Sequence, residues 1–314
     1  MFGSYRLVLA LLVALSHCGL TLFGFNPGQW AVICFYVLSG FLMERQFKKL
    51  SVDGGVTSFY IDRFLRIYPV YFVVTALCAM AMPIGFRDTL INFTLLPQNY
   101  AAFTGVPTLV GAAWSLACEV HFYVLVPLLT QLSNKALRII IALSLTLFAF
   151  SVFLPNNAFW AYGGIPGILF AFLSGMLINR SDWQTLIWTY VAVFTLFAAF
   201  SSTKMLSIVL PTGININVCL GYMCAIPSTV FLSKLSPKVE WDKFAGLFSY
   251  PLFLIHMLVL HLCLERWRHP SVWTFIGLSL LASGVLVLVV EKPSDLLRYR
   301  VRKPKLSSNS RTSP

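Results

Sequence analysis

Residues 5–25 read YRLVLALLVALSHCGLTLFGF, and this stretch decides the fold class. A helix needs about 20 residues to cross the hydrocarbon core of a bilayer, and the stretch offers that length with a single arginine, Arg6, near its start. Comparable apolar stretches follow along the chain at residues 28–44, 67–84, 112–131, 138–154, 165–179, 184–200, 217–233, 246–264 and 272–290. The sequence therefore predicts a bundle of about ten transmembrane helices.

The composition of the whole chain points the same way. Of the 314 residues, 58% are hydrophobic and 11% are charged, and the mean hydropathy is +0.79. An average soluble domain has about 25% charged residues, so the composition excludes a soluble enzyme, a DNA-binding module and a disordered chain. We expect an all-α, polytopic integral membrane protein. Residues 1–297 would form one membrane-embedded domain, and residues 298–314 a disordered, basic cytoplasmic tail.

The positions of the basic residues predict the orientation in the membrane. Lys and Arg concentrate in the cytoplasmic loops of polytopic proteins. With a cytoplasmic N-terminus and ten spans, only four of the 23 Lys and Arg residues fall outside, namely Arg87, Lys204, Arg266 and Arg268. This asymmetry predicts that both termini are cytoplasmic. The net charge of +12 then reflects topology and contact with anionic membrane lipid, and no nucleic-acid partner is expected.

The seven cysteines offer no metal site or disulfide framework, because none has the required spacing. They all lie in apolar stretches: Cys18, Cys34, Cys78, Cys118, Cys219, Cys224 and Cys263. A buried free cysteine behaves as a small hydrophobe, so we expect packing roles and no bound metal. Cys18 is a tempting nucleophile beside His17, but adjacent helical residues point 100° apart, and we expect it to be inert.

Arg6 and His17 are the first candidates for a site inside the membrane, where ionisable residues are costly and often functional. They are eleven positions apart, which is three helical turns plus 20°. Both therefore project from one face, with His17 about 16 Å from Arg6 along the axis and well inside the outer half of the span. The spacing fits a site in which Arg6 binds an anion near the inner membrane edge and His17 acts as a base nearer the outer side. A snorkelling arginine and a histidine bonded to another helix would produce the same pattern.

Glu119, Arg63 and Arg66 extend this candidate site. Glu119, in WSLACEVHFY, is expected about 10 Å from the outer end of its helix, at the depth of His17, where a carboxylate can support an imidazole. Arg63 and Arg66 share one helical face at the inner membrane edge, and guanidinium groups bind phosphates in a forked geometry. The alternatives are a structural ion pair for Glu119 and an ordinary positive-inside loop for the arginines.

Seven segments of the chain resemble, in order, the acyltransferase-3 family over about residues 4–297. They read YRLVLALLVALSH, CFYVLSGFLMER, DRFLRIYPVYF, WSLACEVHFYVLVPLL, GILFAFLSGMLI, SYPLFLIHMLVL and VEKPSDLL. One departure is that Gly3-Ser4 stands where members often have an acidic residue before the first arginine. The family's R-x10-H pattern matches Arg6 and His17, and its R-x-x-R pattern matches Arg63 and Arg66. Its WSL-x-x-E-x-x-FY signature matches Trp114, Ser115, Glu119 and Tyr123, and its LSGF matches a segment that contains Ser39. His256 is a further motif position, in the similar segment SYPLFLIHMLVL.

The resemblance implies an integral membrane acyltransferase of the bacterial cytoplasmic (inner) membrane that modifies sugars of polysaccharides or lipid-linked glycans. It implies acyl-CoA, usually acetyl-CoA, as co-substrate with no bound cofactor, and other polysaccharide-assembly proteins as further partners. We expect Arg6, Arg63 and Arg66 to bind the donor, with His17 as general base or acyl-carrying nucleophile and Glu119 supporting its imidazole. The outer loop 85–111 is long enough to fold over the acceptor site.

Two other functions share this architecture. A transporter or flippase of lipid-linked sugars would also be polytopic with charges inside the membrane, but it would be expected to contain internal repeats with broken helices, and none is visible. A scaffold of an envelope machine would not need the arginine and histidine motifs, which are all present. An acyltransferase is therefore the expected function, with the sugar, the acyl chain and the face of transfer left open.

Overall fold

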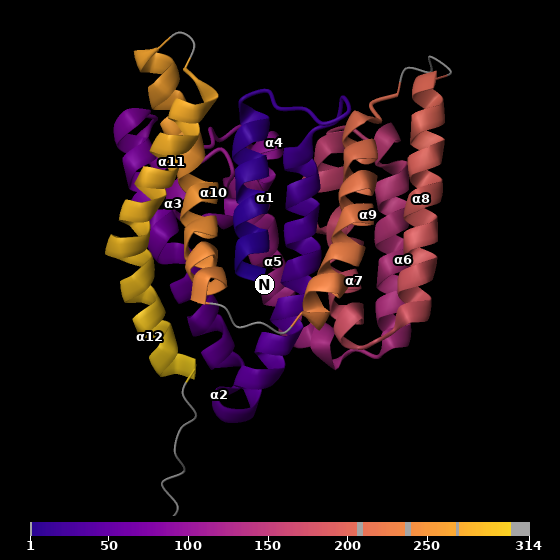
Figure 1. Cartoon of the computed structure of the whole chain (residues 1–314). Helices are drawn as coiled ribbons and strands as arrows, with labels where there is room; N and C mark the ends of the chain where they lie inside the picture. The colour runs from indigo at the N-terminus through magenta and orange to yellow at the C-terminus, as the bar shows by residue number, and fades with distance from the viewer. Residues whose placement is uncertain (1, 206–209, 236–239, 268–269, 303–314) are drawn as a thin grey trace, which may run out of the picture.

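The computed structural model describes residues 2–205, 210–235, 240–267 and 270–302, and the regular structure in these ranges is helical apart from one isolated bridge (Figure 1). The α-helices are α1 (Phe2–His17), α2 (Pro27–Ala81), α3 (Phe86–Phe93), α4 (Ala101–Thr104), α5 (Ala113–Gln131), α6 (Asn134–Phe150), α7 (Ile165–Asn179), α8 (Trp183–Met205), α9 (Gly213–Lys234), α10 (Glu240–Arg266), α11 (Val272–Leu286) and α12 (Lys292–Arg302). Short 3₁₀ or π segments are η1 (Leu96–Tyr100), η2 (Ser151–Phe153), η3 (Phe159–Gly163) and η4 (Val287–Glu291). The all-α fold class is confirmed.

Each predicted apolar stretch contains helix in the structure. Within the described ranges, eight helical segments are long and apolar enough to cross a membrane. The remaining two stretches correspond to α1 and to the first part of α2. α1 is shorter than a typical span, with 16 residues and a length of about 24 Å. The chain is therefore a polytopic helical membrane protein.

α1 ends earlier than the apolar pattern predicted. Gly19 and Gly24 follow it with φ of 86° and 79°, a left-handed region that glycine enters without strain. Asn26 then caps α2 by accepting hydrogen bonds from the N–H groups of Gly28 and Gln29. His17 is consequently the last residue of α1 and is exposed, rather than lying deep in a longer helix.

α2 is a helical hairpin of 55 residues. Its two arms meet at Gly55, where φ is 65° and the helical path is interrupted. The first arm contains the predicted stretch 28–44, and the second contains most of 67–84. Figure 1 shows the turn between the arms at the lower side of the molecule. Residues of both arms, including Ser39 and Arg66, can therefore face one space.

The first arm of α2 packs tightly against α7. A Cβ on Gly40 would lie 1.8 Å from the carbonyl oxygen of Phe172, and a Cβ on Gly175 would lie 2.0 Å from that of Val37. Small residues at such crossings let membrane helices approach closely. The glycines of the two similar segments LSGF and LSGM thus hold the arm that carries Ser39.

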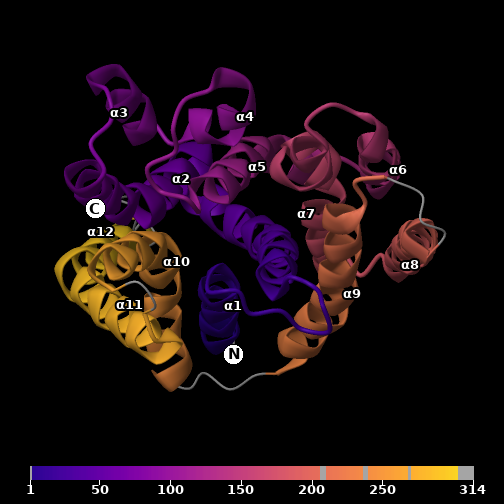
Figure 2. The same cartoon turned by 90° about the horizontal axis from the view of Figure 1, so that it is seen from above.

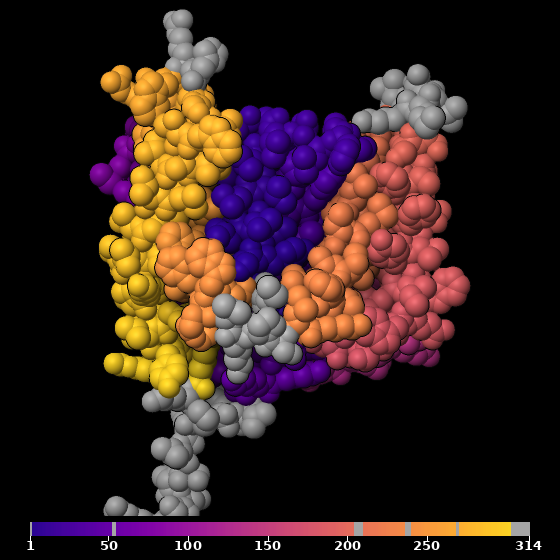
Figure 3. All heavy atoms as spheres, viewed as in Figure 1, coloured from indigo at the N-terminus to yellow at the C-terminus, as the bar shows by residue number. Residues whose placement is uncertain are grey.

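α1 packs beside α2 and α10, between the α10–α12 side and the α9 side of the bundle (Figure 2), and the indigo region at the start of the chain is open to the viewer in Figure 3. Asp242 of α10 accepts hydrogen bonds from the N–H groups of Gly3 and Ser4, at 3.2 and 2.9 Å. These groups have no partner within their own helix, so Asp242 caps α1 from a neighbouring helix. An acidic residue therefore stands next to the start of α1, although none precedes Arg6 in the sequence.

The segment between α2 and α5 is folded rather than open. Asn92 of α3 donates to the carbonyl oxygen of Pro107 and accepts from the N–H of Leu109. Asn99 of η1 donates to the carbonyl oxygens of Trp114 and Gly163. These bonds tie the predicted loop 85–111 to the start of α5 and to η3.

The start of α1 and the end of α12 point to the same side of the bundle (Figure 1), as an even number of spans requires. α12 continues as a helix beyond residue 297, and Arg298 is buried. This differs from the sequence-based boundary at 297/298, because a buried contact with α2 extends the ordered domain to Arg302. The rest of the expected tail, residues 303–314, lies outside the described residues.

Candidate active site

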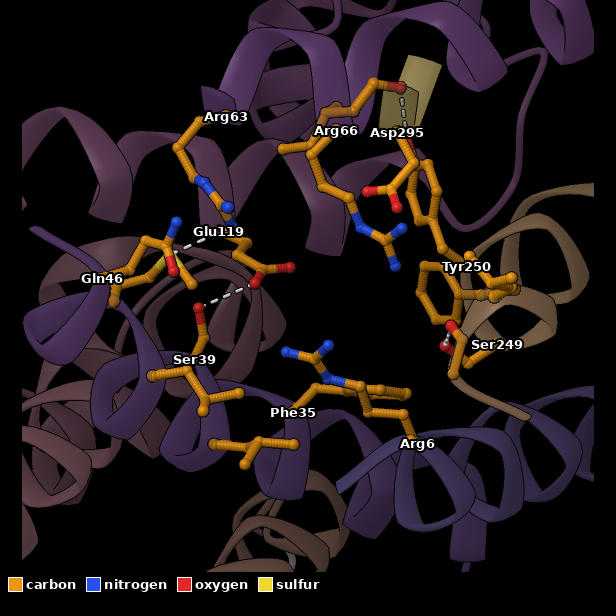
Figure 4. A pocket seen from close by; sticks show the side chains of 18 of the residues that line it. Arg6, Phe35, Ser39, Gln46, Arg63, Arg66, Glu119, Ser249, Tyr250 and Asp295 are labelled. Carbon is orange, nitrogen blue, oxygen red and sulfur yellow. Dashed lines mark hydrogen bonds between the residues drawn. The ribbon is translucent and has the colours of Figure 1, made fainter. Parts of the chain in front are cut away.

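A cavity of about 910 Å³ lies between α1, both arms of α2, α5, α10 and α12. Figure 4 shows Arg6 and Arg66 directed towards each other across it, with Glu119 beside them. The cavity therefore brings together most of the residues that the sequence singled out. Its lining includes Arg6, Ser39, Arg63, Arg66, Ser115, Glu119 and Tyr123.

Positive charge predominates in the cavity. Among the described lining residues, the basic ones are Arg6, Arg45, Lys49, Arg63, Arg66, Lys243, Arg298 and Arg302, and the acidic ones are Glu119, Glu240, Asp242 and Asp295. A cleft with an excess of one charge concentrates ions of the opposite sign. The arrangement is suited to a polyanionic ligand.

Arg6 is one of the cations that face this space. Its guanidinium projects into the cavity from α1 (Figure 4). No ion pair joins Arg6 to another residue in the described part of the chain. A desolvated arginine of this kind keeps its donors available for a ligand.

Arg63 and Arg66 are held by buried carboxylates. Arg63 forms an ion pair with Asp62 and lies over the ring of Tyr123, with 5.8 Å between the guanidinium carbon and the ring centroid. Arg66 forms an ion pair with Glu291 of η4, which is 1% exposed. Such pairs fix the direction of a guanidinium, so both side chains are oriented before any ligand arrives.

Glu119 accepts hydrogen bonds from two hydroxyl groups that also belong to the predicted motifs. Its Oε1 accepts hydrogen bonds from Ser39 Oγ at 2.7 Å and from Tyr123 Oη at 2.5 Å. The structure places Glu119 in the cavity with these partners. In the described part of the chain no hydrogen bond joins Glu119 to His17, since the carboxylate is bonded to Ser39 of the first arm of α2 and to Tyr123, and His17 does not line the cavity.

His17 lies beside His256, with ring centroids 5.3 Å apart. His256 is fully buried on α10, and neither histidine lines the cavity. Phe253 connects the two regions, because it lines the cavity and its ring centroid is 6.3 Å from that of His256. The histidine pair therefore sits just beyond one wall of the basic cavity.

Trp114 and Ser115, the remaining motif residues, support the start of α5. The Trp114 ring packs against Tyr162 at a centroid distance of 4.7 Å. Ser115 Oγ donates to the carbonyl oxygen of Ala112. These contacts position the helix that carries Glu119.

Several site residues had not been identified from the sequence. Asp62 and Glu291 stand in the quoted segments DRFLRIYPVYF and VEKPSDLL, but only the fold pairs them with arginines. Arg298 and Arg302 had been assigned to a tail, and they line the cavity. Among the described residues, no group of three or more His, Cys, Asp or Glu side chains is placed to hold a metal ion.

Comparison with known proteins supports an acyltransferase. The family model of the acyltransferase domain, Acyl_transf_3, matches residues 5–290. The chain is 24% identical to the acyltransferase MdmB of Streptomyces mycarofaciens, over 88% of this chain and 83% of the relative. It is 24% identical to nodulation protein 10 of Rhizobium leguminosarum bv. viciae, over 98% and 96%. It is 25% identical to the putative acetyltransferase ORF330 of Acidianus two-tailed virus, over 75% and 74%.

No solved structure matches the chain. The match to the family model nonetheless spans nearly the whole membrane domain, including both arginine motifs and both histidines. The chain belongs to the acyltransferase-3 family of multi-pass membrane proteins.

Proposed function

We propose that this acyltransferase transfers an acyl group, most simply acetyl, from acyl-CoA to a sugar hydroxyl of a bacterial exopolysaccharide, O-antigen or other envelope glycan. The observation that carries the proposal is the Arg6 guanidinium, which enters a basic cavity without an ion pair among the described residues and shares α1 with His17. The reaction would take place in the cytoplasmic membrane.

The donor would enter from the side of the basic cluster. The phosphates of CoA are strongly anionic, and Arg6, Arg63 and Arg66 offer three oriented guanidiniums. The pantetheine arm has about the length of four extended residues, or roughly 14 Å. Arg6 and His17 are separated by about 16 Å along the helix. An arm that starts at Arg6 would therefore bring its thioester close to His17.

Phe253 lies on the route from the cavity to His17. In the proposed complex the arm passes this ring and Phe35, whose centroid is 5.8 Å from that of Phe253. The apolar walls would exclude water and so limit hydrolysis of the thioester. The acceptor would approach His17 from its exposed side.

His17 would act in one of two ways. As a general base, it takes the proton of the sugar hydroxyl while the oxygen attacks the thioester carbonyl carbon; the C–S bond then breaks, and the imidazolium returns the proton to the CoA thiolate. As a nucleophile, it takes the acyl group first and releases CoA, and the sugar hydroxyl then receives the acyl group from the imidazole.

Glu119 would serve the donor side of the reaction. Its carboxylate lies in the cavity, where it attracts the Arg6 guanidinium. Ser39 and Tyr123 fix the direction of the carboxylate. In this arrangement Glu119 keeps Arg6 pointing into the cavity. It would not support the imidazole of His17, which another group would have to do.

Deletion of the gene tests the proposed function in the cell. NMR of the surface and secreted polysaccharides should lose an O-acyl signal, and expression of the wild-type chain should restore it. His17→Ala should insert normally and fail to restore the signal, since it removes the base or nucleophile. An unchanged polysaccharide in the deletion strain would contradict an envelope glycan acceptor, and restoration by His17→Ala would exclude His17 from the chemistry.

Purified protein tests the donor directly. With [1-¹⁴C]acetyl-CoA and the polysaccharide from the deletion strain, label should appear in the polysaccharide. Label that stays on the wild-type protein without polysaccharide, and does not stay on His17→Ala, would identify His17 as nucleophile rather than base. A flippase would bind the glycan and transfer no label.

A further inference from the structure

α12 folds back against the second arm of α2 and brings two arginines to one buried carboxylate. Arg298 Nε lies 3.3 Å from Asp62 Oδ1, and Arg302 Nε lies 2.8 Å from the same oxygen. Asp62, which is 0% exposed, also pairs with Arg63. Three guanidiniums from two helices therefore converge on a single carboxylate at the edge of the cavity.

The carboxylates around this cluster do not balance its positive charge. Asp295 supplies a second acceptor, at 2.9 Å from Arg298 NH1. Three arginines then share two carboxylates, and Arg45 and Lys49 line the same cavity. Like charges held close together in a partly buried place repel one another. A bound dianion would relieve that repulsion and accept forked hydrogen bonds from the arginines.

The cluster shares Arg63 with the arginines assigned to the donor diphosphate, and Asp62 lies one step closer to the inner end of the bundle than Arg66. Asp62 precedes Arg66 by four residues on α2, which is about 6 Å along the helix. Arg66 pairs with Glu291, just before α12 begins. Asp62 pairs with Arg298 and Arg302, which lie further along α12. Two groups of ion-paired arginines thus follow one another along the facing helices.

CoA carries its phosphates in the same sequence. The diphosphate joins the pantetheine arm to the ribose, and the 3′-phosphate stands on the far side of that single ribose ring. A diphosphate at Arg6, Arg63 and Arg66 would place the 3′-phosphate next to the following basic cluster. The chemistry recognised by that cluster is a terminal phosphate dianion.

We infer that Arg298 and Arg302 of α12, oriented by Asp62, form a subsite for the 3′-phosphate of the acyl-CoA donor. This inference rests on the proposed function, because it requires CoA as donor. It assigns α12 to the substrate site rather than to a tail that signals topology. The subsite distinguishes CoA from donors that carry the same diphosphate and pantetheine without the 3′-phosphate.

Calorimetric binding of CoA and 3′-dephospho-CoA to the full chain in nanodiscs tests the subsite without an acceptor. The wild type should bind CoA about tenfold more tightly than 3′-dephospho-CoA, the size expected for one charge-assisted contact. Arg302→Ala should lose this preference by weakening CoA alone. Arg66→Ala should weaken both ligands. Arg300→Ala is the matched control, because Arg300 is exposed on the same helix and does not line the cavity.

A conservative variant, Arg302→Gln, keeps the test valid if an alanine variant of the cluster does not fold. Arg302 is 33% exposed at its side chain, whereas Arg298 is 7% exposed, so Arg302→Gln should fold even if Arg298→Ala does not. Equal affinity of the wild type for the two nucleotides, or equal weakening of both by Arg302→Gln, would overturn the subsite and leave the donor assignment standing. Failure of the wild type to bind either nucleotide would overturn the donor as well.

A lipid headgroup is the other source of the same phosphate chemistry. Nanodiscs of phosphatidylcholine alone and of phosphatidylcholine with phosphatidylglycerol separate the two. The 3′-phosphate preference should be the same in both. Two results together would assign the cluster to lipid and contradict the subsite. The first is a preference for CoA over 3′-dephospho-CoA that the Arg302 variants do not change. The second is a protein stability that depends on phosphatidylglycerol only when Arg302 is present.

Discussion

The imidazole rings of His17 and His256 lie 5.3 Å apart between centroids and are tilted by 35°. His256 Nδ1 lies 3.2 Å from the carbonyl oxygen of Leu252. Its Nε2 is buried and has no hydrogen-bond partner among the described residues. His256 is therefore the ionisable neighbour that the fold places beside His17.

Replacement of His256 should slow transfer without weakening the donor complex. In His256→Gln, kcat should fall by about 100-fold, the lower range for loss of a proton-transferring group, while KM for the acyl donor stays nearly constant. Steady-state kinetics with labelled acetyl-CoA measure both. Cys18→Ser is the matched control beside His17 and should be nearly silent. A rise in donor KM with unchanged kcat would place His256 in donor binding instead.

Variants of Arg66 and Glu291 should have separable effects on protein stability and on donor binding. Arg66→Gln leaves the buried Glu291 carboxylate without its partner, a change that costs about 3–5 kcal/mol, and it should also raise donor KM about tenfold. The double variant Arg66→Gln/Glu291→Gln should recover most of the stability and none of the donor affinity. Thermal denaturation in detergent and donor titration measure the two effects. Recovery of donor affinity in the double variant would show that Arg66 acts only through stability.

The crossing of α2 and α7 should tolerate no side chain at Gly40. Gly40→Ala would place a methyl group 1.8 Å from the Phe172 carbonyl oxygen, and relief of that overlap requires movement of backbone. We expect a loss of about 3 kcal/mol or more. Gly277→Ala is the control, since a Cβ there meets nothing within 4 Å and alanine favours helix by about 1 kcal/mol. Comparable melting temperatures for the two variants would contradict the close crossing.

Asp182, between α7 and α8, should contribute to stability in a pH-dependent way. Although its burial acts to raise the pKa, hydrogen bonds from Arg138 and Thr185 lower the pKa of Asp182 below its usual value. The stabilisation is therefore present above the unfolded-state pKa of about 4 and is lost as pH falls through the lower, folded-state pKa.

Asp182→Asn should accordingly cost about 1 kcal/mol at pH 7, and the difference from wild type should shrink below pH 4. Melting curves from pH 3 to pH 7 measure this. Glu240→Gln is the control, because the Glu240 side chain is 86% exposed in its pair with Lys243. A constant difference between Asp182→Asn and wild type across that range would show that the charge of Asp182 is irrelevant to stability.

The sequence indicates the spacing of site residues only where the information is local. Arg63 and Arg66 share a helical face by spacing alone, and Arg6 and His17 share another. The prediction for Glu119 and His17 relied on equal depth in two separate helices, and it missed that glycines end α1 at His17. Depth along the membrane normal does not specify which helices are neighbours, and the partner of His17 comes from α10.

The sequence alone determined the polytopic all-α fold and the candidate residues, because burial in lipid forces long apolar helices and makes each internal charge conspicuous. Only the tertiary structure decided the pairings: Arg66 with Glu291, Asp62 with Arg298 and Arg302, and His17 with His256. These contacts join residues far apart in the chain, and helix packing, which depends on the fit of whole surfaces, brings them together.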